Sequence, residues 1–194
     1  VTGPGSSTGQ ALVAHPSVDA VGFVGGTSTG RQIMATAAGS LKKVGLELGG
    51  KSANIVLASA DFDRALDGSL MGIFTGNGEQ CLAGSRILVE AGIADRFIEA
   101  FVARVKNLRI GDPFADDTEI GPLAFAAHYD RVQGFAETAR GGEYQLLAGG
   151  GRAAGFERGY FFQPTVVETT DNAAALCKKE IFGPFVTIQR VANL

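Results

Sequence analysis

The sequence contains few of the residues that define several protein classes. Among 194 residues there are two cysteines, Cys81 and Cys177, 96 positions apart and outside any CxxC motif. This excludes a disulfide framework and favours a reducing, cytoplasmic location. The two histidines have no cysteine or carboxylate partners at ligand spacing, so no metal site is expected. No stretch approaches the ~18 apolar residues of a membrane span, and the opening VTGPGSSTGQ lacks the pattern of a signal peptide.

Charge and proline are also low. A net charge of −3 gives no general electrostatic basis for binding nucleic acid or an anionic membrane. Six prolines and no low-complexity tract argue against a collagen-like or disordered chain. Glycine, in contrast, is abundant: 28 of the 194 residues are glycine, about twice the usual share of ~7%. With 45% hydrophobic residues, the chain is long enough for a core and for one or two domains.

The two ends of the sequence are unusual for a domain. The chain begins at Val1 and enters a glycine-rich stretch at once, and residues 185–194 (FVTIQRVANL) have the pattern of a strand. Domains usually begin and end in loosely held surface segments. We therefore expect an interior piece of a longer chain, the alternative being a processed or compact small domain.

Short β-rich runs alternate with longer helical ones, which predicts α/β layers around a largely parallel sheet. Residues 3–9 and 111–123 are expected to be loops. The expected strands are Ala20–Val24, Lys43–Leu48, Ala53–Leu57, Arg86–Glu90 and Gln145–Ala148. The expected helices are Thr8–Ala14, Arg31–Ala38, a segment from the N-cap Asp61 to about Phe74, one beginning near Cys81, Ile93–Val105 and His128–Ala139.

Cys81 is the first candidate for chemistry. It lies in GNGEQCLAGSR, where glycines let a ligand approach the backbone closely. A helix beginning near Cys81 would aim N–H groups at the sulfur, which favours the thiolate and supplies donors for an oxyanion. The alternative is a buried structural cysteine. Cys177 follows an apolar run, and for it we expect the buried, structural role.

Two carboxylates are weaker candidates. Glu47 lies between two leucines in LELGGK, where loss of water would favour its use as a base. In an alternating strand, however, Glu47 points away from Leu46 and Leu48 and can simply face solvent. Glu180, in EIFGPF, can accept bonds from ribose hydroxyls, and Phe182 can lie against a flat heterocycle. The alternative for this segment is an ordinary turn with one core phenylalanine.

Two glycine-rich segments, GPGSSTG and FVGGTSTGR, each precede an expected helix. Unpaired N–H groups at a helix start can bind phosphate. Neither segment matches GxGxxG or the P-loop pattern. Phosphate binding and an ordinary βα turn therefore remain equally open from these residues alone.

The order of the motifs resembles the NAD(P)-dependent aldehyde dehydrogenases. FVGGTSTGR, LELGGK, GNGEQCLAGSR, GDPFADDTEIGPL, YFFQPTVV and KEIFGP follow one another at that family's spacing, with Cys81 34 positions after Glu47. The resemblance covers nearly the whole chain, from about Gly3 to the end. It implies an aldehyde dehydrogenase-like fold, with residues 1–50 as the last part of the NAD-binding domain and residues 51–194 as a catalytic domain truncated at its C-terminus. The family's oxyanion-hole asparagine and its cofactor-binding lysine are expected upstream of Val1.

The resemblance also implies roles for individual residues. Cys81 corresponds to the catalytic nucleophile and Glu47 to the base for deacylation. Glu180 corresponds to the residue that binds the nicotinamide ribose, and Phe182 to the one near the nicotinamide. Gly26 stands where many relatives have a serine that contacts phosphate, so only backbone donation is expected there. The implied cofactor-binding residues are Gly5, Gly9, Gly25, Gly26, Leu48, Glu180 and Phe182.

The activity implied is oxidation of a small aldehyde to a carboxylic acid through a thioester on a cysteine. NAD is the expected cofactor, with NADP as the alternative, and a homodimer or homotetramer is expected for the longer protein. TGNGEQCLAGSR resembles the muconic-semialdehyde group of the family, which points to a semialdehyde substrate. Two alternatives remain: an inactive fragment or partial binding module, and an acylating enzyme in which coenzyme A replaces water. The glutamate of LELGGK favours water, because a thiol acceptor has less need of a base.

Overall fold

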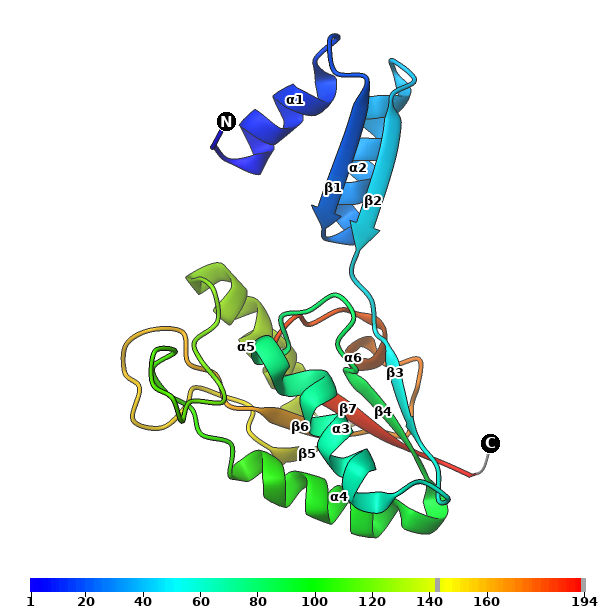
Figure 1. Ribbon diagram of the computed structural model, residues 1–194, viewed down its shortest axis with the longest axis vertical. Coiled ribbons are helices and arrows are strands. Elements are labelled where there is room, and N and C mark those ends of the chain that lie inside the picture. The colour runs from blue at the N-terminus through cyan, green and yellow to red at the C-terminus, as the bar shows by residue number, and fades with distance from the viewer. Residues whose placement is uncertain (142–143, 193–194) are drawn as a thin grey trace. The chain divides into compact units, whose positions relative to one another are not determined.

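The computed structural model describes residues 1–141 and 144–192 and divides the chain into two compact units, Val1–Gly49 and Gly50–Leu194. The first unit is a βαβ element preceded by a short helical segment (Figure 1). Its strands β1 and β2 are parallel, in a register that runs from Ala20 opposite Lys43 to Gly25 opposite Leu48. The elements of this unit are η1 (Gly5–Gly9), α1 (Gln10–Ala14), β1 (Ala20–Gly25), α2 (Thr27–Ala38) and β2 (Lys43–Leu48).

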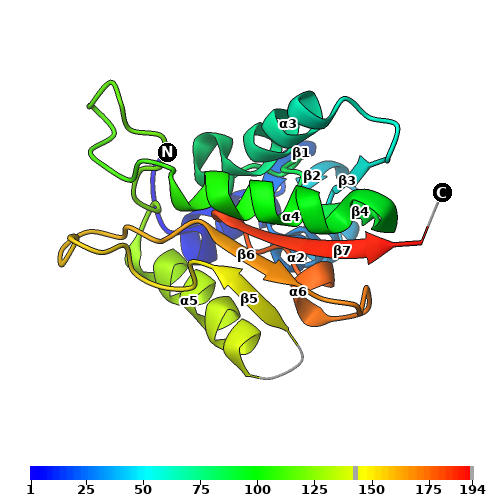
Figure 2. The same cartoon turned by 90° about the horizontal axis from the view of Figure 1, so that it is seen from below.

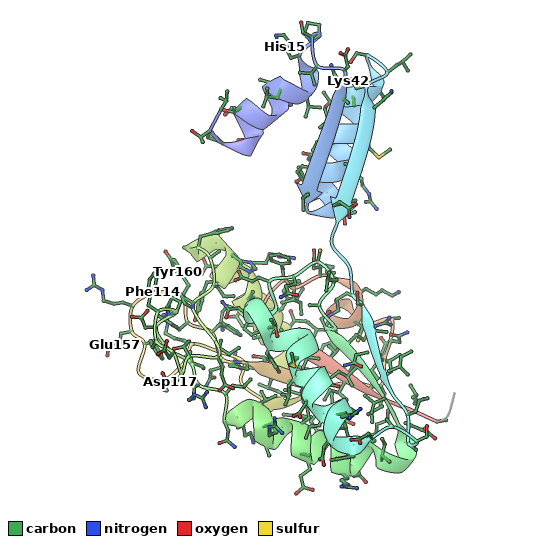
Figure 3. All side chains as sticks on the ribbon, viewed as in Figure 1. His15, Lys42, Phe114, Asp117, Glu157 and Tyr160 are labelled. Carbon is green, nitrogen blue, oxygen red and sulfur yellow. The ribbon has the colours of Figure 1, made fainter. Side chains whose placement is uncertain are left out.

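Close helix–strand contact holds the first unit together. Gly30 of α2 is buried, and a Cβ added to it would lie 2.8 Å from Cδ2 of Leu48. A larger residue at this position would force the end of the Leu48 side chain to move, so glycine favours the close approach of α2 to β2. At the other end of the unit, Nζ of Lys42 donates to the carbonyl oxygens of His15 and Val18, each at 2.6 Å (Figure 3). This amine fixes the turn that enters β1 to the turn that enters β2.

The second unit is a five-stranded sheet in the order β3-β4-β7-β6-β5, covered by helices on both faces (Figures 1 and 2). All neighbours are parallel except β5 and β6, which form an antiparallel edge pair. Its elements are β3 (Ala53–Val56), α3 (Phe62–Phe74), η2 (Thr75–Gly78), β4 (Arg86–Glu90), α4 (Ala91–Lys106), α5 (Ala126–Arg140), β5 (Gln145–Ala148), β6 (Thr165–Glu168), α6 (Ala175–Lys178) and β7 (Phe185–Val191).

Successive side chains of the central strands enter different cores. Val166 of β6 joins the core under α3 and α4, whereas its neighbour Val167 joins the core under α5. The two faces of a strand alternate with period two, so a sheet covered on both faces needs apolar residues at every position. In the first core the Phe101 ring is stacked between two others. Its centroid lies 5.9 Å from that of Phe97 and 6.2 Å from that of Phe74.

Most of the expected elements are confirmed. Strands Arg86–Glu90 and Gln145–Ala148 have the predicted bounds, and Asp61 caps α3 by accepting a bond from the Arg64 N–H at 3.1 Å. The α/β fold with a largely parallel sheet is confirmed as well. The final strand covers Phe185–Val191, and residues 193–194 lie outside the described residues. The loop between α4 and α5 is confirmed, and its Phe114 is 95% exposed (Figure 3).

Three expectations about local structure are wrong. Residues 5–9, expected to form a loop, make a wide helical turn that continues into α1, because the Gln10 N–H donates to the Gly5 carbonyl five residues back. Helix α2 begins at Thr27, directly after Gly26, and not at Arg31. No helix begins near Cys81, which lies in a turn closed by a 3.2 Å bond from the Ala83 N–H to the Gln80 carbonyl. The chain passes from that turn directly into β4.

Candidate functional site

Cys81 is exposed, on the loop that joins α3 to β4. The loop leaves α3 through three successive left-handed residues, Gly76 (φ 59°), Asn77 (φ 59°) and Gly78 (φ 69°). Glycine adopts this conformation freely and asparagine is the side-chain residue that tolerates it best. The reversal turns the chain out of the helix, and Cys81 lies in a turn, so the expected helix N–H groups aimed at the sulfur are absent.

The structure brings the GNGEQC and EIFGP motifs into contact. A Cβ added to Gly78 would lie 2.3 Å from the carbonyl oxygen of Gly183, so the two backbones touch at that position. The LELGGK motif reaches the same place through its second glycine. A Cβ added to Gly50 would lie 3.7 Å from the carbonyl oxygen of Cys81. Residues separated by more than 100 positions in the sequence therefore meet at the loop that carries Cys81.

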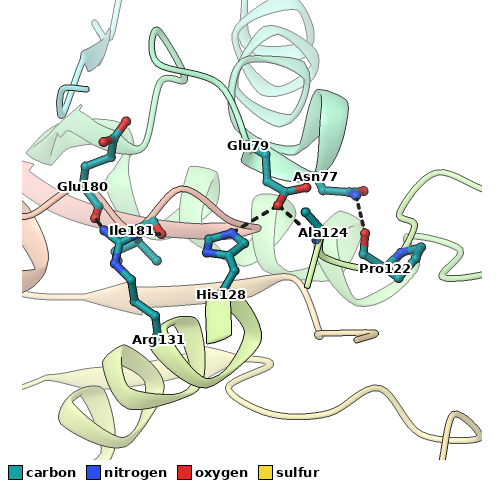
Figure 4. A network of polar contacts seen from close by, with 8 residues as sticks. All are labelled: Asn77, Glu79, Pro122, Ala124, His128, Arg131, Glu180 and Ile181. Carbon is teal, nitrogen blue, oxygen red and sulfur yellow. Dashed lines mark hydrogen bonds and ion pairs between the residues drawn. The ribbon is translucent and has the colours of Figure 1, made fainter. Parts of the chain in front are cut away.

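The EIFGP turn is held by an arginine from α5. The guanidinium of Arg131 donates to the carbonyl oxygens of Glu180 and Ile181, the latter at 3.2 Å (Figure 4). Phe182 has a left-handed backbone (φ 58°) and a side chain that is 36% exposed, while Ile181 is buried. A bulky residue in this conformation persists only where the surroundings enforce it. The carboxylate of Glu180 is on a half-buried residue at the start of the same turn.

A polar network ties the Cys81 loop to the segment that precedes α5 (Figure 4). The Asn77 amide accepts from the Gly121 N–H at 2.9 Å and donates to the Pro122 carbonyl at 3.1 Å. Oε1 of Glu79 accepts from the Ala124 N–H at 3.4 Å and lies 3.1 Å from Nε2 of His128.

Lys51, the last residue of LELGGK, is half-buried beside the residue that precedes β4. Its Nζ donates to the Ser85 carbonyl at 3.3 Å. Burial lowers the pKa of Lys51 from 10.5 to about 8. The positive charge of Arg86 acts in the same direction, and the charges of Cys177 and Glu180 act against it. The amine is therefore in the electrostatic field of the EIFGP glutamate.

The lowered pKa of Lys51 predicts a pH-dependent stability. Between about pH 8 and 10.5 the unfolded chain keeps a proton that the folded chain has lost, so the free energy of unfolding rises with pH there, by up to about 1.4 kcal/mol per pH unit. In Lys51→Met this contribution disappears and the slope flattens. Urea unfolding at several pH values measures it, with the exposed Lys178→Met as the matched control. Equal slopes in wild type and Lys51→Met would contradict the prediction.

The first unit contains a hollow of about 850 Å³ between η1, α1, β1 and α2. A Cβ added to Gly5 or Gly9 would meet no atom within 4 Å, so the backbone is open there. Its walls combine apolar side chains with uncharged polar ones. The lining residues are Gly5, Ser6, Gly9, Gln10, Leu12, Val13, Val21, Gly22, Phe23, Thr29, Gln32, Ile33, Ala35 and Thr36. Such walls, with a bare glycine backbone, suit a flat heterocycle attached to polar groups.

The other candidates of the first unit lie at the carboxyl ends of its parallel strands. Gly25 ends β1, and a Cβ there would lie 2.6 Å from the Phe23 ring. Gly26 is the N-cap of α2, with no side chain to donate. Glu47 and Leu48 end β2; Leu48 packs against Gly30, and Glu47 is exposed in this unit. The carboxyl ends of parallel strands are where ligands bind in open α/β sheets.

The predicted site residues thus form two groups. Within the second unit, the loop of Cys81 contacts the turn that contains Glu180 and Phe182, and Cys177 is 2% exposed, as expected. Within the first unit, the glycines split, since Gly5 and Gly9 line the hollow and Gly25 and Gly26 do not.

Sequence reasoning missed several residues of the site. His128 shares the buried face of α5 with Val132 and Ala136, at intervals of four, so a histidine on an apolar helical face was the available signal. The Asn-Gly dipeptide at Asn77 is a turn signal. Nothing in the sequence indicated that Glu79 or Arg131 would reach its partner.

Comparison with known proteins gives the family. The model of the aldehyde dehydrogenase family matches residues 1–194. An aldehyde dehydrogenase from Alternaria alternata is 44% identical over 98% of this chain and 38% of its own length. Among solved structures, HpcC from Thermus thermophilus superimposes with a TM-score of 0.96 at 40% identity, over 100% of this chain and 38% of that one. Betaine aldehyde dehydrogenase from Staphylococcus aureus, solved as a double mutant in complex with NAD⁺ and with a BME-modified cysteine, gives 0.96 at 38% identity, over 98% of this chain and 39% of that one.

The chain belongs to the aldehyde dehydrogenase family, and its α/β fold is the fold of that family over the matched region. It spans less than two-fifths of the Alternaria relative. In residues 1–141 and 144–192, no helix combines the length and apolar character that crossing a bilayer requires.

Proposed function

We propose that this chain supplies the nucleophile and part of the cofactor site of an NAD-dependent enzyme that oxidises aldehydes to carboxylic acids. One observation supports this most strongly. The exposed Cys81 lies on a loop in backbone contact with the EIFGP turn, while the other cysteine, Cys177, is buried. A catalytic thiol must be accessible to substrate and held in place, and Cys81 meets both conditions.

The two units receive different roles in this proposal. Residues 1–50 form the last part of the cofactor-binding domain, and residues 51–194 form the thiol-bearing catalytic domain. The 850 Å³ hollow beside Gly5 and Gly9 has the apolar walls and open backbone that an NAD⁺ heterocycle and its polar linkage need. Gly25, Gly26 and Leu48 at the strand ends are assigned to the same cofactor, as are Glu180 and Phe182 of the EIFGP turn. When bound, NAD⁺ supplies the acceptor for the hydride that leaves the substrate.

Cys81 carries the covalent chemistry. Its thiolate attacks the aldehyde carbon, forming a carbon–sulfur bond and a thiohemiacetal oxyanion. We assign the stabilisation of that oxyanion to the backbone N–H of Cys81. Departure of a hydride then restores the carbonyl and leaves a thioester on Cys81. The loop between α3 and β4, which carries Cys81, is proposed to hold the sulfur through both steps.

Glu47 is proposed as the base of the second half of the reaction. It removes a proton from water, the hydroxide attacks the thioester carbonyl, and the carbon–sulfur bond breaks to release the carboxylate and the thiol. Glu47 is three residues before Gly50, so the covalent chain alone keeps their Cα atoms within about 11 Å. A Cβ added to Gly50 would lie within van der Waals distance of the Cys81 carbonyl, so the glycine end of LELGGK that belongs to the second unit lies close to the backbone of the nucleophile.

The substrate is proposed to be a semialdehyde, on the resemblance of TGNGEQCLAGSR to the muconic-semialdehyde group. A cytoplasmic homodimer or homotetramer completes the proposal. The experiment is a panel of aldehydes, including betaine aldehyde and dicarboxylic semialdehydes, incubated with the intact protein and NAD⁺ or NADP⁺. Absorbance of the reduced cofactor gives the rates.

The expected result is turnover with NAD⁺, fastest with a semialdehyde and independent of coenzyme A. An absolute need for coenzyme A would establish the acylating alternative. The same assay on the isolated 194 residues tests the alternative of an inactive binding module. Absence of turnover with every aldehyde in the intact protein would overturn the proposal.

A further inference from the structure

We propose that Glu79 and His128 form a positioning pair that holds the Cys81 loop against the turn containing Phe182. The inference rests on the proposed function, because it concerns how Cys81 is held. It assigns to two residues outside the sequence-predicted site the task of fixing the nucleophile's backbone. Neither residue is assigned a contact with substrate.

The Cys81 loop needs external support. Its left-handed run at Gly76, Asn77 and Gly78 has one short backbone bond of its own, from the Glu79 N–H to the Gly76 carbonyl at 3.0 Å. Glycine has more accessible backbone conformations than any other residue, so a run with two glycines needs outside contacts to stay in one of them. The side chains that bond this loop to neighbouring segments therefore help to determine where Cys81 lies.

Asn77 and Glu79, two positions apart in the loop, provide that support. Asn77 bonds to the backbone at Gly121 and Pro122, and Glu79 accepts from the Ala124 N–H (Figure 4). Gly78, between them, lies against the Gly183 carbonyl on the other side. The loop therefore lies between the segment before α5 and the EIFGP turn. Of the two loop residues whose side chains bond to that segment, Asn77 and Glu79, Glu79 is the nearer to Cys81 in sequence.

His128 lies between Glu79 of the Cys81 loop and Phe182 of the EIFGP turn. It is 7% exposed, its Nε2 lies 3.1 Å from Oε1 of Glu79, and its ring centroid lies 6.0 Å from that of Phe182 and 5.8 Å from that of Phe125. Across the described residues, Nε2 has no well-aligned hydrogen bond, so Glu79 is the polar group that faces it. A carboxylate facing a buried imidazole interacts more strongly than an exposed pair.

The His128 side chain therefore lies between the loop of Cys81 and the EIFGP turn. It faces the Glu79 carboxylate of the loop, and its ring lies beside the ring of Phe182. Loss of the carboxylate should loosen the loop around Cys81 and leave a buried imidazole without its partner.

The test is a double-mutant cycle in the intact protein, with Glu79→Ala, His128→Ala and the double variant. Each single change is expected to lower kcat by about tenfold or more, while KM for NAD⁺ changes less than about threefold, because the pair orients the nucleophile. The double variant is expected to be no worse than the more impaired single variant, since both changes remove one interaction. The rate of Cys81 alkylation by iodoacetamide should change in parallel.

Two further variants exclude a general folding defect. Glu79→Gln keeps an acceptor for the Ala124 N–H and a polar group facing His128, and should retain at least about a third of wild-type kcat. If Glu79→Ala or His128→Ala does not fold, the cycle is measured with Glu79→Met and His128→Phe, which remove the polar contact and keep more of the side-chain volume. Glu157→Ala, on the exposed loop labelled in Figure 3, is the matched control and should leave kcat unchanged.

Additive losses in the cycle, or unchanged kcat and alkylation in Glu79→Ala, would overturn the positioning pair. Cys81→Ala is measured in the same assay. Retained activity there means that the proposed function has failed. Inactive Cys81→Ala together with a normal Glu79→Ala means that only the positioning pair has failed.

Discussion

Cys81→Ala is expected to lower the turnover of the intact protein by about 10⁴-fold or more, because a methyl group cannot attack the aldehyde. Cofactor affinity should change little, since the cofactor residues assigned in the first unit are untouched. Initial rates of cofactor reduction with a semialdehyde measure the effect. Binding of NAD⁺, followed by fluorescence quenching or calorimetry, measures the affinity separately.

Cys177→Ala is the matched control for this prediction. The Cys177 side chain is 2% exposed, and its Sγ faces the Thr187 hydroxyl at 3.7 Å, inside the second unit. Truncation there should cost about 1 kcal/mol of stability and leave turnover within a factor of about two. Turnover that survives loss of Cys81 and disappears with loss of Cys177 would reverse the assignment of the nucleophile.

Glu47→Gln is expected to separate the two halves of the reaction. The amide occupies nearly the same volume but cannot take a proton from water, so the thioester should form and then persist. Rapid mixing should show a burst of reduced cofactor close to one per thiol, followed by a steady-state rate lower by about 10²–10⁴-fold. The exposed Glu99→Gln on α4 is the control and should show wild-type kinetics.

Two results would contradict the role of Glu47. A variant with neither burst nor turnover would place Glu47 before the oxidation, as the group that activates Cys81. A variant with normal steady-state turnover would make Glu47 an ordinary solvent-facing residue of β2, which is the alternative that the alternation of LELGGK leaves open.

The architecture was predictable because its signals are local. Strand Arg86–Glu90 is a short apolar run bounded by turn residues, and α4 presents Phe97, Phe101 and Val105 at helical spacing. Asp61 occupies an N-cap position and caps α3. Because strands separated by helices form parallel sheets, the α/β class followed from these elements. The antiparallel edge formed by β5 and β6 did not, since pairing direction depends on distant partners.

The interior of the candidate site was predictable only in part. Cys81 and Glu180 stand out by their motifs, and the structure places their loops in contact through Gly78 and Gly183. The helix expected at Cys81 is absent because the left-handed run before it turns the chain away, and the sum of local propensities does not reveal such a reversal. The Glu79–His128 contact joins residues 49 positions apart, and only the packing of α5 against the loop brings them together.

The most direct test of the central claim is mass spectrometry of the acyl-enzyme. The Glu47→Gln variant, mixed with a semialdehyde and NAD⁺ and quenched in acid within the burst, should carry one acyl group, recovered on the peptide that contains Cys81. An acyl group on the peptide of Cys177, or an unmodified protein after the burst of reduced cofactor, would contradict the account.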